Sequence, residues 1–156
     1  LNDLIGEGLG LYENSSADVV VSLADGLPLV LGDATQMRQI IHNLLRNAED
    51  AQEGRDKAGI EIGTRLAGGL AELYVADAGP GFPPEIMARV FEPYVTTKAK
   101  GTGLGLAIVK KIVDEHHGSI DITNRQQGGA QVCIRLPLSP WQHEQVKAAN
   151  GTHPGR

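Results

Sequence analysis

Cysteine is almost missing from this sequence: Cys133 stands alone among 156 residues. A single thiol excludes an intrachain disulfide framework and a zinc site built from cysteine pairs. Redox chemistry through a pair of thiols has no support either. We therefore expect the chain to work in a reducing, cytoplasmic compartment.

Long apolar runs and an excess of basic residues are missing too. No stretch approaches the roughly 18 consecutive apolar residues of a transmembrane helix, and no signal peptide opens the chain. With 14 basic and 19 acidic residues the net charge is −5, which argues against nucleic acid as a partner. We also expect no direct membrane contact. Because the chain begins at Leu1 rather than Met, we expect a piece of a longer protein.

The remaining composition is that of one folded domain. Hydrophobic residues make up 41% of the chain and charged residues 21%, which excludes disorder over the whole length. Helices are expected at residues 1–14, 33–53, 83–90 and 104–116, and strands at residues 17–24, 60–66, 70–76, 119–124 and 131–136. The strands do not alternate strictly with helices. We therefore expect a mixed sheet covered on one face by helices, not a doubly wound parallel sheet.

The helix after Asp33 has the clearest pattern. Asp33 can cap it, and the Gln36 side chain can reach back to the cap. One face is an apolar stripe, made of Met37, Ile40, Ile41, Leu44, Leu45 and Ala48. The opposite face carries Asn43, Asn47 and Asp50, which could bind a hard cation such as Mg²⁺ through neutral and acidic oxygens. The alternative is an ordinary solvated helix face.

Two glycine-containing segments add further candidates. Asp77 follows a predicted strand and precedes Gly79 and Gly81, so its carboxylate could accept a hydrogen bond from an exocyclic amine; an ordinary Asp-Gly turn is the alternative. Residues 101–106, Gly-Thr-Gly-Leu-Gly-Leu, lead into a helix N-terminus, where alternating glycines can present backbone amides to a phosphate. Nearby Lys98 and Lys100 add positive charge. The segment lacks the Gly-Lys-Ser/Thr ending of a P-loop, and a dinucleotide fingerprint fits it poorly.

Four segments together resemble the sequence boxes of a known family. The asparagine helix, the Asp77 loop, Phe91-Glu92-Pro93-Tyr94 and residues 101–106 are similar, in this order, to the N, G1, F and G2 boxes of the histidine kinase catalytic domain. This domain shares its ATP-binding fold with gyrase, Hsp90 and MutL. The resemblance implies an α+β fold, a two-layer α/β sandwich whose mixed, mostly antiparallel sheet is covered on one face by about three helices. It covers residues 1–138 and leaves residues 139–156 as a polar tail.

The resemblance also implies the site residues. Asn47 would hold Mg²⁺, Asn43 would lie one turn earlier on the ATP-facing side, and Asp77 would bind the adenine amino group. Residues 91–102 would form the lid over the nucleotide. The full set of implied ATP contacts is Asn43, Asn47, Asp50, Asp77, Gly79, Gly81, Thr97, Lys98, Lys100, Gly101, Thr102, Gly103, Leu104, Gly105 and Leu106.

One position within the set separates hydrolysis from transfer. Gyrase-like ATPases have a water-activating glutamate where this chain has Asn43, and an amide cannot take a proton. The implied reaction is therefore transfer of the γ-phosphate to a histidine, with Asn43 and Asn47 as the catalytic positions. None of the five histidines stands in the family's acceptor motif.

The resemblance implies partners as well. The acceptor would lie on a separate helical dimerisation domain, which residues 1–14 would join to this one, in a homodimeric protein that serves a response regulator. Whether the full-length protein is anchored in a membrane stays open. The sequence is most similar to nitrogen-regulation kinases of the NtrY and NtrB type, but Ala130 stands where the family often has Thr near the adenine. Two other functions stay open: a catalytically silent nucleotide-binding scaffold, and a serine kinase of the anti-sigma class.

Overall fold

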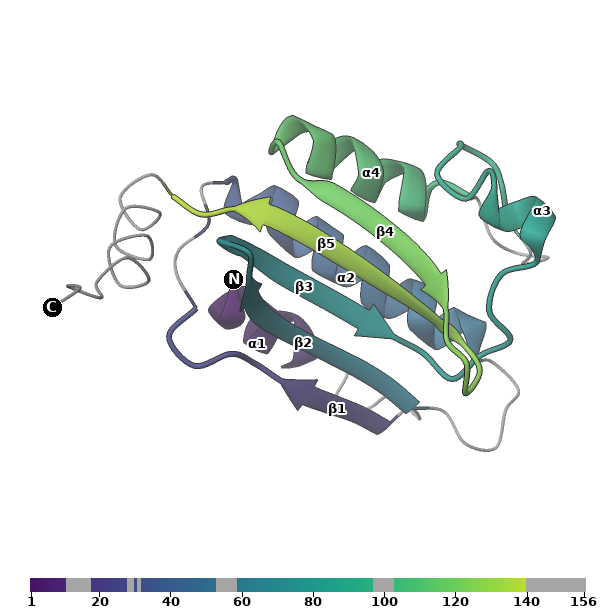
Figure 1. Ribbon diagram of the computed structural model, residues 1–156, viewed down its shortest axis with the longest axis horizontal. Coiled ribbons are helices and arrows are strands. Elements are labelled where there is room, and N and C mark those ends of the chain that lie inside the picture. Colours follow the sequence, from purple (N-terminus) through teal and green to yellow (C-terminus); the bar gives the residue numbers. More distant parts are fainter. Residues whose placement is uncertain (11–17, 28–29, 31, 53–58, 97–102, 140–156) are drawn as a thin grey trace, which may run out of the picture.

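The computed structural model describes residues 1–10, 18–27, 30, 32–52, 59–96 and 103–139, which form a sheet layer and a helix layer (Figure 1). The strands are β1 (Asp18–Ser22), β2 (Gly59–Ala67), β3 (Leu70–Ala76), β4 (Ser119–Asn124) and β5 (Ala130–Pro137). The helices are α1 (Asn2–Gly10), α2 (Ala34–Ala51), α3 (Pro84–Met87) and α4 (Gly105–Glu115). Of the expected polar tail, only Ser139 belongs to the described part, and residues 140–156 lie outside it.

The sheet has the order β1-β2-β3-β5-β4. β1 pairs with β2 in parallel, and the other three pairs, β2 with β3, β3 with β5 and β5 with β4, are antiparallel. β5, the last of the described strands, therefore lies inside the sheet, between β3 and β4. This arrangement confirms the expected mixed, mostly antiparallel sheet.

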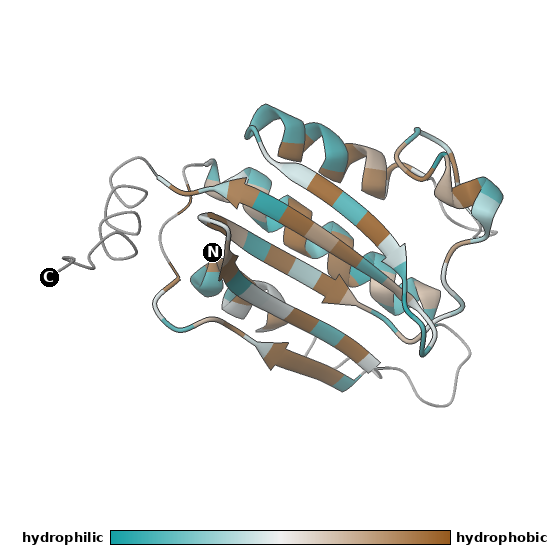
Figure 2. Cartoon of the chain, viewed as in Figure 1, coloured by the Kyte–Doolittle hydropathy of each residue, from teal (hydrophilic) through white to brown (hydrophobic). Residues whose placement is uncertain are grey.

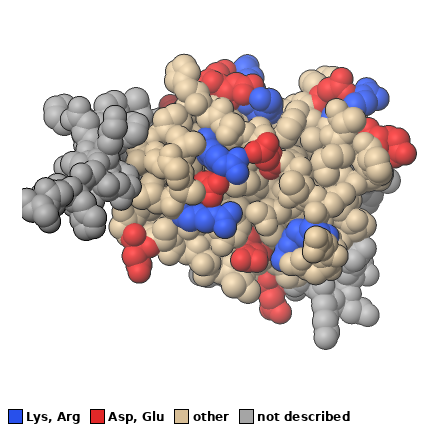
Figure 3. All heavy atoms as spheres, in the orientation of Figure 1, with Lys and Arg blue, Asp and Glu red and all other residues tan. Residues whose placement is uncertain are grey.

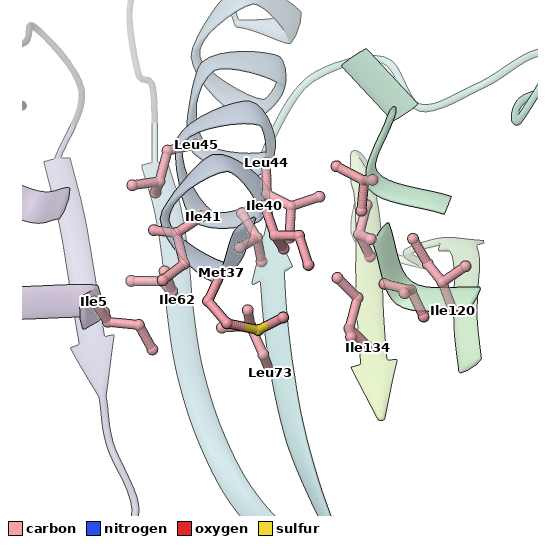
Figure 4. Packing of buried hydrophobic residues seen from close by; sticks show 14 of the residues in the cluster. Ile5, Met37, Ile40, Ile41, Leu44, Leu45, Ile62, Leu73, Ile120 and Ile134 are labelled. Atoms are coloured by element: carbon pink, nitrogen blue, oxygen red, sulfur yellow. The ribbon is translucent and has the colours of Figure 1, made fainter. Parts of the chain in front are cut away.

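One face of the sheet carries the core. Alternate strand positions point toward the helices, and Ile62, Leu73, Ile120 and Ile134 all belong to one buried cluster. Helices α1, α2 and α4 cover this face and contribute apolar side chains to the same cluster, among them Ile5 (Figure 4). Figure 2 shows the resulting alternation of hydrophobic and hydrophilic residues along the strands. The expectation of about three covering helices is confirmed.

Helix α2 supplies the largest share of the core. All six residues of its predicted apolar stripe are buried, and Asp33 caps the helix by accepting a 3.1 Å hydrogen bond from the Gln36 N–H. The other half of the expected capping arrangement is wrong. The Gln36 side chain donates to Glu115 Oε2 at 3.3 Å, because the end of α4 lies beside it.

The element boundaries differ slightly from the expected ones. Helix α2 ends at Ala51, where the Gln52 backbone N–H donates to Glu49 O and its side chain donates to Ala48 O. Helix α3 ends at Met87, three residues before the expected end. The β2–β3 hairpin turns on Gly68 and Gly69, whose φ angles are 59° and 75°, so Ala67 belongs to the strand. Positive φ at both positions is what a tight two-residue hairpin requires.

The other face of the sheet carries a row of charges, visible in Figure 3 as basic side chains beside acidic ones. Glu72 is buried and accepts from Arg65 Nε at 2.8 Å and from Arg135 Nε at 2.9 Å. Arg135 also donates to Asp121 at 2.6 Å. Hydrogen bonding to Glu72 raises the pKa of Arg65, and hydrogen bonding to Asp121 raises the pKa of Arg135. These pairs offset the cost of burying the Glu72 side chain.

Candidate functional site

The polar face of α2 is the first part of the site. Asn43 and Asn47 are partly buried, and Asp50 is exposed near the end of the helix. Asn43 Nδ2 is buried and has no hydrogen-bond partner among the described residues. A buried amide hydrogen without an acceptor costs about 1–3 kcal/mol, so the position favours a bound group that supplies an oxygen.

Asp77 is the second part. It follows β3 directly and is only 5% exposed. Its Oδ1 atom accepts hydrogen bonds from the Gly79 N–H at 2.9 Å and from the Ala130 N–H at 3.3 Å. The Asp77 N–H donates in turn to Ala130 O at 3.0 Å. These bonds fix both the backbone and the carboxylate of Asp77.

Gly79 brings the Asp77 loop against the end of α2. A Cβ atom at this position would lie 2.6 Å from Ala51 O, a separation at which backbone or side chain would have to shift. Glycine therefore permits a contact that places Asp77 beside the end of α2 that carries Asn47 and Asp50. Sequence reasoning singled out these residues on two separate segments, and the structure brings the segments together.

The segment before α4 is the third part. Gly103 has a φ of 71°, and its carbonyl accepts a 3.0 Å hydrogen bond from the Tyr94 N–H. A Cβ atom at Gly103 would lie 2.5 Å from the Tyr94 carbonyl carbon. Leu104 then stands at the N-cap of α4, which begins at Gly105 and includes Leu106. Residues 103–106 thus lead into a helix N-terminus, as expected, although the helix starts one residue later.

The N-terminus of α4 lies at the level of the two asparagines. Helices α2 and α4 pack antiparallel (Figure 1). At the start of α2, the Gln36 side chain donates to Glu115 and the Asp33 N–H donates to His116, and both partners lie at the end of α4. Ten residues of helix span about 15 Å, so the start of α4 reaches the part of α2 that lies near Asn43 and Asn47. Backbone N–H groups there favour an anion.

Five of the expected contacts cannot be placed. These contacts are Thr97, Lys98, Lys100, Gly101 and Thr102, which lie outside the described residues.

Within the described part of the chain, no three His, Cys, Asp or Glu residues form a group that could hold a metal ion. A cation at this site would therefore use an amide oxygen together with oxygens of the bound ligand and water, which is a donor set that suits Mg²⁺.

The described helices include none that is long and apolar enough to span a membrane.

Sequence reasoning missed the residues that hold the Asp77 loop from outside. Asn124 and Arg125, where β4 ends, bond to the backbone of Phe82 and Asp77 respectively. An Asn at a strand end just before a turn with paired glycines is a signal that could have drawn attention to them.

Comparison with known proteins identifies the family. Residues 32–140 match the family described as histidine kinase-, DNA gyrase B-, and HSP90-like ATPase. The chain belongs to this family. Family membership accounts for the convergence of the asparagine helix, the Asp77 loop and the start of α4, and it implies that the domain uses a nucleotide.

Related sequences of this ATPase family narrow the assignment to sensor histidine kinases. An NtrY-like sensor histidine kinase from Rickettsia bellii is 48% identical over 106 residues, which are 68% of this chain and 17% of that protein. The sensory histidine kinase/phosphatase NtrB from Rhodobacter capsulatus is 38% identical over 133 residues, covering 78% of this chain and 37% of that protein. The chain thus spans well under half the length of these relatives.

Solved structures give the same assignment. The catalytic domain of histidine kinase ThkA in a nucleotide-free form has a TM-score of 0.79 and 34% identity, with 91% of this chain and 95% of that chain covered. The mycobacterial sensor histidine kinase MprB has a TM-score of 0.76 and 29% identity, with 89% and 95% covered. The chain is therefore a catalytic domain of the sensor histidine kinase type within the ATPase family, which confirms the fold and family expected from the sequence boxes.

Proposed function

We propose that this domain binds ATP with Mg²⁺ and donates the γ-phosphate to a histidine of a separate domain. The observation that carries the proposal is the buried Asn43 Nδ2, which lacks an acceptor among the described residues and lies on the polar face of α2. An oxygen-rich ligand would supply that acceptor. The proposed domain covers residues 1–138.

Asp77 is proposed to select the adenine base. A carboxylate accepts hydrogen bonds only, and its orientation is fixed by the N–H groups of Gly79 and Ala130. Such an acceptor fits the exocyclic amine of adenine. Gly81 completes the loop at a φ of 77°, a conformation that favours glycine.

The phosphates are proposed to lie between α2 and the start of α4. The backbone of Gly103, Leu104, Gly105 and Leu106 would face them, and Thr97, Lys98, Lys100, Gly101 and Thr102 are proposed as further contacts. Asn47 would give its amide oxygen to Mg²⁺, with Asp50 near the same end of α2. The ion would neutralise charge on the phosphates and orient them.

Transfer, not hydrolysis, is the proposed reaction. Asn43 cannot remove a proton from water, so the domain's part is to bind the nucleotide and orient the γ-phosphate. The acceptor is proposed to be a histidine on a helical dimerisation domain of the same protein, joined to this domain through residues 1–14. A homodimeric full-length protein and onward transfer to a response regulator complete the proposal. Nucleic acid and direct membrane contact have no part in it.

Titration calorimetry of the domain with ATP, with and without Mg²⁺, tests binding. We expect Mg²⁺-dependent binding that Asp77→Asn and Asn47→Asp each weaken at least tenfold. The first replaces one acceptor oxygen for the base with a donor, and the second places a negative charge near the phosphates. Asp121→Asn, on the charged sheet face, is the matched control and should bind as the parent does. An unchanged affinity in Asp77→Asn would remove the proposed base contact.

A second measurement tests transfer. The isolated domain should hydrolyse ATP very slowly, and a helical domain with an acceptor histidine should become labelled when it is added. The label should be lost in acid and kept in base, as phosphohistidine is; acid-stable label would indicate a serine acceptor instead. Rapid turnover of ATP without any acceptor would contradict the assignment of transfer.

A further inference from the structure

The turn between β4 and β5 is hydrogen-bonded to the loop that carries Asp77. Asn124, the last residue of β4, accepts a 2.9 Å hydrogen bond from the Phe82 N–H through Oδ1 and donates a 2.8 Å bond to Phe82 O through Nδ2. One side chain thus holds both backbone groups of a residue 42 positions away. Gly81 allows the approach, because a Cβ atom there would lie 2.7 Å from Asn124 Oδ1.

The other end of the loop is held by the same turn. Arg125 donates from Nη1 to Asp77 O at 3.3 Å, and its guanidinium lies 4.0 Å from Glu61. The turn itself is closed by the Arg125 N–H, which donates to Gly129 O at 2.8 Å. Gly129 crosses so close to Asp77 that a Cβ atom would lie 1.9 Å from Asp77 O.

These contacts hold the loop through its backbone, at Phe82 and at Asp77. Asn124 is exposed, so water could replace its hydrogen bonds to Phe82 at a modest cost in global stability. What water cannot replace is the fixed distance between the end of β4 and Phe82. Losing that constraint lets residues 77–82 sample other conformations, and ordering them again on binding lowers affinity.

We propose that Asn124 and Arg125 are positioning residues for recognition of the nucleotide base, acting through Phe82 and Asp77 without touching the ligand. The inference rests on the proposed function, since it gives Asp77 a base to recognise. It assigns base selectivity partly to the β4–β5 turn. Phosphate binding at α2 and α4 is independent of this turn.

The test compares ATP with inosine triphosphate, which has an oxygen where adenine has its amine. Affinities of the full chain are measured with Mg²⁺ present, the weaker ligand by competition against labelled ATP. In Asn124→Ala we expect the affinity for ATP to fall about tenfold and that for inosine triphosphate to stay the same, so that the preference for ATP falls about tenfold. Arg125→Met, which keeps the aliphatic stem, should change the preference in the same direction by a smaller factor.

Controls separate positioning from a general loss of structure. Gln126→Ala alters an exposed side chain of the same turn that makes no hydrogen bond in the described part of the chain, and should keep the parent's preference. Glu61→Gln removes the partner of the long Arg125 ion pair and should also keep it. Asn124→Asp retains an acceptor for the Phe82 N–H but loses the donor to Phe82 O, so its preference should lie between those of the parent and Asn124→Ala.

The possible results are distinct. Equal losses for both nucleotides in Asn124→Ala would mean that the turn supports the fold only, and no loss for either would mean that it supports nothing at the site; each overturns the inference. If the parent chain binds neither nucleotide, the proposed function itself fails. Melting temperatures of all variants show whether unfolding contributes.

Discussion

His116 accepts a hydrogen bond at Nε2 from the Asp33 backbone N–H, 3.2 Å away, and so joins the end of α4 to the cap of α2. Its Nδ1 lies 2.8 Å from Ile112 O, which can only accept. These two contacts fit the tautomer that carries its proton on Nδ1.

This tautomer is testable by spectroscopy and mutation. At pH 8 the ¹⁵N chemical shifts of His116 should show the ring proton on Nδ1. His116→Phe should lower the free energy of unfolding by about 1–2 kcal/mol, because the Asp33 N–H loses its acceptor. Urea denaturation measures the second effect. A ring protonated on Nε2 at pH 8 would contradict the assigned hydrogen bond.

The end of α4 gives opposite expectations for two neighbouring positions. His117 has a φ of 58° and is exposed, whereas a Cβ atom at Gly118 would lie 2.5 Å from Arg135 O. His117→Gly should therefore stabilise the chain by about 0.5–1 kcal/mol, since glycine avoids the strain of left-handed backbone but loses more entropy on folding. Gly118→Ala should destabilise it. Thermal denaturation of both variants checks the pair, and stabilisation by Gly118→Ala would refute the close contact.

Asn43 should show a trade between stability and binding. Asn43→Leu removes a buried amide that has no acceptor in the described part of the chain. The free energy of unfolding of the ligand-free variant should therefore be about 1 kcal/mol higher than that of the parent. Its affinity for Mg-ATP should fall at least tenfold. Denaturation and calorimetry on the same sample measure the two effects. If the variant is less stable and still binds ATP normally, Asn43 is not part of the binding site.

Cys133 should make stability depend on alkaline pH. Burial, followed by the negative charge of Glu72, raises the pKa of its thiol. The folded chain thus holds this proton more tightly than the unfolded chain, so the stabilisation is complete below the ordinary thiol pKa and is lost as pH rises through the raised one. The free energy of unfolding should fall above about pH 8.5, and fall less steeply in Cys133→Ala. Identical pH profiles for the two chains would contradict the shift.

Much of the site could be predicted because it depends on local patterns. The helical period placed Asn43 and Asn47 opposite the apolar stripe of α2, and Asp33 marked the start of that helix. Asp77 and its glycines stood where a strand should end. These features need only neighbouring residues, and the order of the four boxes added the family.

The rest depends on contacts between distant segments. The approach of Gly79 to Ala51, and of Gly129 to Asp77, explains why those glycines are needed, but neither contact has a local signal. The two bonds from Asn124 to Phe82 join residues that no periodicity relates. The donation of Gln36 to Glu115 replaced a capping bond that local rules favour, because packing supplied another acceptor.

The position of β5 inside the sheet also sets an order of events during synthesis. Asp77 depends on Ala130, 53 residues later, for bonds to its backbone and its carboxylate. A ribosome that has released only the first four strands has made every residue of α2 and the Asp77 loop, yet the strand that joins β3 to β4 is still missing. The bonds that orient Asp77 can therefore form only after β5 has emerged and entered the gap between β3 and β4.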